Sequence, residues 1–95
     1  MAGYVYFMSD RPHGAVYTGV TSDIAARATQ HRSGTGSVFT QRYRLRRLVY
    51  IERHATITLA IQREKTIKHW PRAWKVRLIH RDNPNWDDLY DTLLA

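Results

Sequence analysis

The chain opens with two β-type segments on either side of a turn sequence, and this pairing constrains the fold more than any other feature. Residues 3–9 (GYVYFMS) and 15–20 (AVYTGV) are rich in aromatic and β-branched side chains, and the DRPHG between them contains turn-forming residues. The two segments therefore predict a β-hairpin. With the turn centred near residues 11–12, Tyr6 is expected opposite Tyr17 on one face of the sheet.

The sequence after the hairpin, TSDIAARATQHRSGTG, predicts a short helix that begins at Ile24. The serine or the aspartate just before Ile24 can cap the N-terminus of this helix, and Gly34 can end it. Arg27 and His31 recur with helical spacing, so they share the stripe that carries the few apolar residues of the helix. We therefore expect both side chains to point toward the interior of the protein.

The rest of the chain predicts one more strand and three more helices. Residues 33–47 are expected to form a loop, and the strand is expected at 48–54 (LVYIERH). Helices are expected at about 57–69 and 71–81, followed by a last short helix near the C-terminus. The order ββαβααα predicts a single α+β domain over residues 1–95, with one three-stranded, mostly antiparallel sheet flanked by helices.

The helix expected after the third strand carries a carboxylate in its apolar stripe. Its apolar positions recur with helical spacing at Ile57, Ala60, Ile61 and Ile67. Glu64 falls on the same stripe. An ionised carboxylate is rarely buried without a partner, because its desolvation costs several kcal/mol or more. We therefore expect a cation to meet Glu64.

The charge balance favours a polyanionic partner. The sequence has 15 Lys and Arg residues against 8 Asp and Glu residues, which gives a net charge of +7 and a pI near 10.3. Such a balance suits nucleic acid first and an acidic membrane surface second. The chain has no cysteine, which excludes disulfides and thiolate zinc sites, and no segment resembles a signal peptide or a membrane span of ~20 apolar residues. We expect a cytoplasmic protein with no membrane partner.

Two other groups allow more than one interpretation. Arg42, Arg44 and Arg46 lie in the most basic run of the chain, and they form either a phosphate-binding surface or a solvated face. Trp70 and Trp74 lie four residues apart, which favours a clasp in the core over a platform for base stacking. The histidines outside the first helix lack the spacing of a zinc site.

Four motifs follow one another along the chain: Tyr4-Val5-Tyr6, then Val16-Tyr17-Thr18-Gly19, then Arg27 with His31 one turn later, and a distant helical Glu64. In this order and spacing they resemble the GIY-YIG nuclease superfamily. The resemblance covers nearly the whole chain and is greatest to the small stand-alone bacterial members. The phrases that carry it are VYTGVTSDIAARATQH, RLVYIE, AIQREKTIKHWPRAWKVRLI and NPNWDDLY.

The resemblance implies an activity and a set of site residues. Members of the family catalyse metal-dependent hydrolysis of nucleic-acid phosphodiesters, so the expected partner is nucleic acid, DNA more than RNA. Glu64 matches the metal-binding glutamate of the family, and its cation would be Mg²⁺ or Mn²⁺, completed by waters and a phosphate oxygen. Tyr6 and Tyr17 match the two motif tyrosines. Arg27 matches the motif arginine, and His31 matches a histidine found in many members.

Each of these residues has an expected role. A tyrosine whose pKa is lowered by nearby cations can take a proton from the attacking water. We favour Tyr6 as that base, assisted by His31, although the sequence leaves the choice of tyrosine open. Tyr17 would position water or phosphate, and Arg27 would hold the phosphate. The five polar tips are expected to line one partly solvated pocket, with Arg27 as the cation nearest to Glu64.

Two positions depart from several members of the family. Val20 stands where those members carry a lysine, and Val76 stands where they carry an asparagine. Lys65, Lys68 or Asn83 can serve in their place. Lys65 and Lys68 are therefore grouped with the arginine run as expected contacts to nucleic acid.

Two functions of different classes follow from the sequence. The first is an endonuclease that acts on structured or damaged DNA. The second is a DNA-binding, RNA-binding or partner-docking module of the same fold with a weak or idle catalytic centre. The complete set of five site residues favours the endonuclease. We expect its substrate choice to come from the shape of the nucleic acid or from a protein partner.

Overall fold

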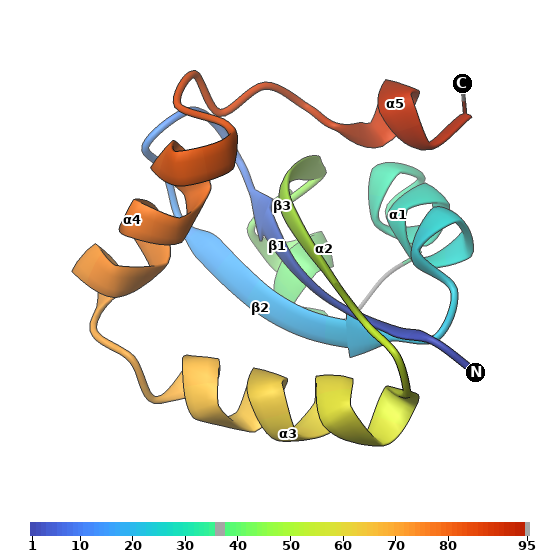
Figure 1. The fold of residues 1–95 in the computed structure, drawn as a ribbon. Helices are drawn as coiled ribbons and strands as arrows, with labels where there is room; N and C mark the ends of the chain where they lie inside the picture. Colours follow the sequence, from blue (N-terminus) through green and yellow to red (C-terminus); the bar gives the residue numbers. More distant parts are fainter. Residues whose placement is uncertain (36–37, 95) are drawn as a thin grey trace.

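An antiparallel sheet of three strands, in the order β2-β1-β3, has helices on both of its faces (Figure 1). The structure is a computed structural model that describes residues 1–35 and 38–94. Along the chain the elements are β1 Gly3–Ser9, β2 Val16–Thr21, α1 Ile24–Arg32, α2 Val38–Arg42, β3 Arg47–His54, α3 Ile57–Lys68, α4 Arg72–Asp82 and α5 Tyr90–Leu94. The α+β class and the three-stranded antiparallel sheet that the sequence predicts are confirmed.

The register of the hairpin differs from the prediction by two residues. Tyr6 pairs with Gly19, and Tyr17 pairs with Met8. The turn is centred later than expected, and His13 within it adopts a left-handed conformation with φ of 61°. Because the pleat repeats every two residues, a shift of two keeps both tyrosines on one face of the sheet. Their ring centroids are 6.4 Å apart, so the predicted proximity holds although the predicted pairing was wrong.

Local capping sets the starts of α1 and α3. The Asp23 carboxylate accepts a hydrogen bond from the backbone N–H of Ala26, and the Thr56 hydroxyl accepts one from that of Leu59. α1 ends at Arg32, and Gly34 follows with φ of 81°, a conformation that glycine adopts without strain. Both helices therefore begin where the sequence predicts.

One helix was not predicted. The segment before β3, for which the sequence predicts only a loop, contains the five-residue helix α2. A helix of little more than one turn shows no apolar repeat, so the hydrophobic pattern carries no signal for it. α3 is the longest of the described helices at 12 residues. In residues 1–35 and 38–94 no helix combines the length and apolar character needed to cross a membrane.

Side chains of β1 alternate between two cores. Val5 and Phe7 pack against α3 and α4, whereas Tyr6 and Met8 point to the other face and pack against α1. α1 and α3 therefore cover opposite faces of the sheet, and β2 is an edge strand between them (Figure 1). Groups carried by these two helices can approach one another only around the edge that β2 forms.

Candidate active site

Tyr6 is one end of a buried chain of hydrogen-bonded side chains. Its side chain projects from β1 toward α1, and the residue is 0% exposed. The Tyr6 hydroxyl is 3.0 Å from Nε2 of His31, and Nδ1 of His31 is 2.9 Å from the Thr40 hydroxyl. With the proton on Nδ1, His31 donates to Thr40 and accepts from Tyr6. Thr40 belongs to α2, the short helix for which the sequence pattern carries no signal, so Thr40 was not predicted as part of the site.

Burial controls the ionisation of this chain. Burial first, and the neighbouring Tyr17 second, raise the pKa of Tyr6 to about 12, although Arg27 acts in the opposite direction. Burial and the charge of Arg27 lower the pKa of His31, so its imidazole is neutral at physiological pH. The expectation that nearby cations lower the pKa of the favoured tyrosine was therefore wrong for Tyr6, because desolvation outweighs the cation.

Gly19 allows the backbone of β2 to pass directly over the Tyr6 ring. A Cβ atom at this position would lie 2.4 Å from both Cζ and the hydroxyl oxygen of Tyr6. Glycine is therefore required for packing. This contact explains why the small residue in the second motif lies opposite the tyrosine of the first.

Tyr17 occupies a more open position than Tyr6. It projects from the edge strand β2 and is half-buried. Its ring centroid lies 6.4 Å from that of Tyr6 and 5.8 Å from that of His31. The two phenols and the imidazole therefore form one cluster, in which Tyr17 is the member on the solvent side.

Arg27 faces the same cluster from α1. It is half-buried, so its guanidinium is not sealed in the core. Its positive charge acts on the pKa of both Tyr6 and His31. The inward position that the helical spacing predicts for Arg27 and His31 is confirmed, with His31 only 2% exposed.

Glu64 approaches the cluster from the opposite face of the sheet. The residue is 8% exposed on α3, and its negative charge contributes to the raised pKa of Tyr6. Its ion-pair partner is Lys68 on the next turn of α3, with 3.1 Å between Nζ and Oε1. A cation does meet Glu64, but the expectation that it would be Arg27 was wrong, because α1 and α3 cover different faces.

The five predicted residues are close together without sharing one solvated pocket. Tyr6 and His31 are buried, which contradicts the expectation that all five polar tips line one partly solvated pocket. Tyr17 and Arg27 are half-buried around them. The site therefore has a buried interior behind Tyr17, formed by Tyr6 and His31, and a solvent-accessible side along β2.

A metal at this site would have few protein ligands. Among the described residues, no group of three or more His, Asp or Glu side chains could enclose an ion. Glu64 offers one carboxylate whose ion-pair partner is a lysine that is 52% exposed and so easily displaced. Such a donor set fits Mg²⁺, which keeps several waters and binds through one or two carboxylates plus substrate phosphate.

The predicted nucleic-acid contacts lie on different surfaces. Arg44 and Arg46 line a shallow cavity whose other lining residues are Asp10, Arg32, Arg47 and Asp88. Arg42 is exposed with its guanidinium 5.8 Å from the centroid of the Tyr43 ring. Lys65 is exposed on α3, and Lys68 lies beside β2. Their binding to nucleic acid stays a prediction.

The positions that depart from the family pattern are structural. Val20 and Val76 pack against the core formed by β1, α3 and α4. Asn83 is 5% exposed, and its amide donates to the carbonyls of Val49 and Asp87. Asn83 therefore cannot serve as the substitute that the sequence left open.

Only one of the two tryptophans packs against the core. Trp70 and Trp74 meet edge to face with 5.7 Å between ring centroids, as the spacing predicts. Trp70 packs against the core, whereas Trp74 is 48% exposed. The core clasp that the sequence favoured therefore applies to Trp70 and not to Trp74.

Comparisons with known proteins give relatives for most of the chain. The sequence model of the GIY-YIG catalytic domain matches residues 2–77. UPF0213 proteins from Staphylococcus aureus strains Mu50 and USA300 are each 40% identical over 76 residues, which cover 80% of this chain and 89% of theirs. The solution NMR structure of a UPF0213 protein from Bacillus halodurans matches with a TM-score of 0.57 and 30% identity, over 93% of each chain.

Proposed function

The chain belongs to the GIY-YIG family and, within it, to the small bacterial UPF0213 proteins, and from this premise we propose that it is a metal-dependent endonuclease. It hydrolyses phosphodiester bonds of nucleic acid, with structured or damaged DNA as the favoured substrate. The net charge of +7 suits such a polyanion.

One observation carries the proposal. Residues from three separate elements act electrostatically on a single buried phenol: Tyr17, Arg27 and Glu64 each change the pKa of Tyr6. An ordinary core tyrosine has apolar neighbours, whereas this one has a cation, a carboxylate and a second phenol around it. Clusters of perturbed titratable groups occur preferentially at catalytic sites.

Tyr6 and Tyr17 differ in burial, and we assign them different roles in the reaction. Tyr6 is fully buried with a pKa near 12, so it is a poor base for a water that arrives from solvent. Tyr17 is half-buried on the open side of the cluster. We therefore assign the proton of the attacking water to the Tyr17 oxygen, in place of the Tyr6 oxygen that the sequence favoured.

The remaining residues of the site orient the reacting groups and neutralise the negative charge of the phosphate. Arg27 holds a phosphoryl oxygen, and its charge also opposes the rise in the pKa of Tyr6. The chain from Tyr6 through His31 to Thr40 fixes the orientation of these rings. A divalent cation held by Glu64 would supply charge neutralisation at the phosphate and stabilisation of the leaving 3′ oxygen.

A cleavage assay with two matched variants tests the proposal. Wild-type protein, Tyr17→Phe and Tyr6→Phe are incubated with Mg²⁺ or Mn²⁺ on plain, nicked, flapped and branched DNA and on RNA. We expect metal-dependent cleavage of at least one DNA, a loss of about a hundredfold or more in Tyr17→Phe, and a smaller loss in Tyr6→Phe. A larger loss of cleavage rate in Tyr6→Phe than in Tyr17→Phe would show that Tyr6 is the general base.

The same assay decides on the second candidate function. The raised pKa of Tyr6 and the absence of the family lysine and asparagine at Val20 and Val76 favour a module that binds nucleic acid without cutting it. Such a module would bind the DNA panel in a salt-dependent manner and cleave none of it with either metal. That result would replace the endonuclease proposal.

A further inference from the structure

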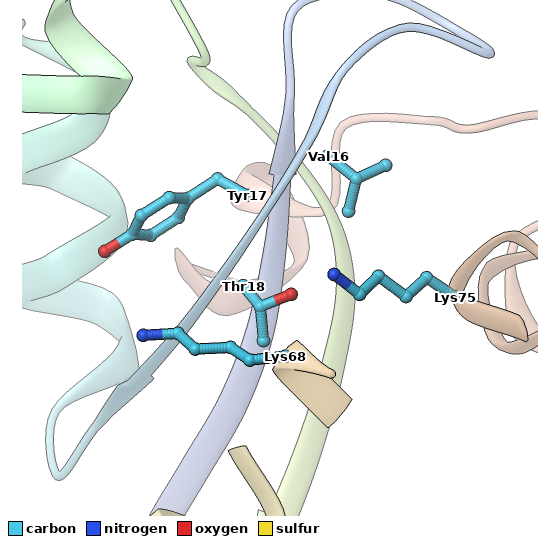
Figure 2. Close-up of a pocket in the computed structure, with 5 residues that line it drawn as sticks. All are labelled: Val16, Tyr17, Thr18, Lys68 and Lys75. Atoms are coloured by element: carbon cyan, nitrogen blue, oxygen red, sulfur yellow. The ribbon is translucent and has the colours of Figure 1, made fainter. Parts of the chain in front are cut away.

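A cavity of about 240 Å³ opens beside the edge strand β2, next to the proposed catalytic cluster. Figure 2 shows the residues that line it, which come from β2, α3 and α4: Val16, Tyr17, Thr18, Lys68 and Lys75. Tyr17 belongs both to this cavity and to the cluster with Tyr6 and His31. Figure 2 shows the Tyr17 hydroxyl turned away from Thr18 and Lys75, so a ligand between these two residues would lie across the edge strand from that hydroxyl.

The cavity contains a buried hydroxyl without a partner. Thr18 is 4% exposed, and among the described residues its Oγ1 has no hydrogen-bond partner. Buried hydroxyls are normally satisfied, because an unmade hydrogen bond is costly. Figure 2 shows this oxygen turned toward the ammonium end of Lys75. Thr18 is thus a donor directed at the space that Lys75 also faces.

Two lysines from different helices meet at the same cavity. Lys68 is on the last turn of α3, and Lys75 is on α4. Burial first, and the like charge of Lys68 second, lower the pKa of Lys75. No carboxylate of residues 1–35 and 38–94 lies within ion-pair distance of Lys75, while Lys68 is paired with Glu64. An anion beside Thr18 would pair with the Lys75 ammonium, which Figure 2 shows next to the Thr18 hydroxyl.

We propose that this cavity binds a backbone phosphate of nucleic acid adjacent to the phosphate that is cleaved, with Lys75 and Thr18 as its donors. Lys68 joins them when it leaves Glu64. In this role the site rests on the proposed function, but its affinity for phosphate does not depend on catalysis. Two ammonium groups and a hydroxyl match the charge and the acceptor oxygens of a phosphodiester.

The first test measures binding of inorganic phosphate to the metal-free protein by NMR titration. We expect phosphate to shift the backbone amide of Thr18 and the side-chain signals of Lys75. Lys75→Gln should raise the Kd about fivefold, the effect of losing one partly solvated charge contact. Thr18→Val, which keeps the shape of the side chain, should also raise it. Arg53→Gln is the control: Arg53 is exposed on β3, the edge strand on the other side of the sheet from β2, and its loss should leave the Kd unchanged.

The second test measures binding to DNA without metal as a function of salt. Lys75→Gln should reduce the salt slope by about 1, as for the loss of one phosphate contact, and Arg53→Gln on β3 provides the comparison. Binding to two other anionic partners is measured in parallel. One is vesicles that contain phosphatidylglycerol, and the other is an acidic peptide. If only vesicle or peptide binding depends on Lys75, the nucleic-acid assignment is overturned.

The outcomes separate this site from the endonuclease proposal. If Lys75→Gln loses phosphate affinity while the wild-type protein cuts no nucleic acid, the phosphate site stands and the catalytic proposal fails. If the wild-type protein cuts DNA while Lys75→Gln and Thr18→Val match Arg53→Gln in phosphate affinity, salt slope and KM, the phosphate site fails.

Discussion

Two carboxylates, Glu52 on β3 and Glu64 on α3, are similarly buried but differ in their partners. Their side chains are 17% and 10% exposed. Glu52 on β3 accepts hydrogen bonds from the Tyr50 hydroxyl at 2.6 Å and from Arg63 at 2.9 and 3.3 Å, and it contacts His54 at 2.6 Å. Glu64 has an ion pair with Lys68 on its own helix.

The helix α3 carries two charged residues with different roles: Arg63 pairs with Glu52 and stabilises the fold, whereas Glu64 is the proposed metal ligand. Arg63 and Glu64 are adjacent on α3, so their side chains leave the helix in different directions. Arg63 reaches the carboxylate of β3, where both oxygens of Glu52 are already bonded. Glu64 faces the side of β2 with a partner that is half in solvent. A carboxylate with several fixed donors stabilises the fold, whereas one with a displaceable lysine can take another cation.

The largest expected effect is on cleavage. Glu64→Gln should lower the single-turnover rate with Mg²⁺ by about a thousandfold, because the proposed metal loses its one protein carboxylate. DNA binding should be retained, since the cationic surface is unchanged. Glu52→Gln is the matched control and should keep the rate within about threefold at a temperature where it is folded. Equal rates for wild type and Glu64→Gln would remove the metal assignment.

The next largest effect is on the free energy of unfolding. Here we expect Glu52→Gln to have a larger effect than Glu64→Gln, the reverse of their order in the cleavage assay. Glu52→Gln should lower the free energy of unfolding by about 2 kcal/mol, because Arg63 and the Tyr50 hydroxyl lose a charged acceptor. Glu64→Gln should change it by less than about 1 kcal/mol, since its ion pair is partly solvated. Urea denaturation followed by circular dichroism measures both. A larger loss in Glu64→Gln would make Glu64 the structural carboxylate.

The stabilisation by Glu52 should also depend on pH. Burial raises the pKa of Glu52, but the hydrogen bonds from Arg63, Tyr50 and His54 outweigh it and lower the pKa below 4.5. A lowered pKa in the folded state gives stability that is present above the unfolded value and lost as pH falls through the folded value. The difference between wild type and Glu52→Gln should therefore shrink below about pH 4.5. A constant difference down to about pH 3 would contradict this origin.

The sequence predicted what depends on local pattern. The hairpin segments, the start of α1 at Ile24, the buried stripe with Ala60 and Ile67, and the inward position of His31 all follow from periodicity and capping. The sequence left the cap open between Ser22 and Asp23, and the structure shows that it is Asp23. The hairpin register did not, because the turn centre depends on the left-handed residue His13. The error was an even number of residues, so it left Tyr6 and Tyr17 on one face.

Contacts between elements could not be predicted in the same way. Ile61 shares the predicted stripe of α3 but is 37% exposed, because the sheet covers a narrower arc of the helix than the pattern allows. The Lys68 partner of Glu64 was available from its spacing of four residues. Thr18 and Lys75 meet only because α4 packs beside β2, and no spacing along the chain encodes that contact.

The smallest expected effect sharpens the contrast between the partners of the two carboxylates. If Lys68 is a displaceable counterion, Lys68→Met should increase the affinity of the free protein for Mn²⁺ by about threefold to fivefold, because the metal no longer competes with an ammonium. Methionine keeps most of the apolar stem of lysine. The concentration of free Mn²⁺, measured by electron paramagnetic resonance without DNA, gives the affinity directly.

Arg63→Met is the control for the Mn²⁺ measurement, since Arg63 is adjacent on α3 but bonds to Glu52. It should destabilise the protein and leave the Mn²⁺ affinity unchanged. The double variant Glu64→Gln/Lys68→Met should bind Mn²⁺ no better than Glu64→Gln alone, because the two residues act through one contact. An equal gain in affinity from Lys68→Met with and without Glu64 would mean that the lysine repels the ion at long range. Glu64 would then hold Lys68 in place without binding the metal, and its role would resemble that of Glu52.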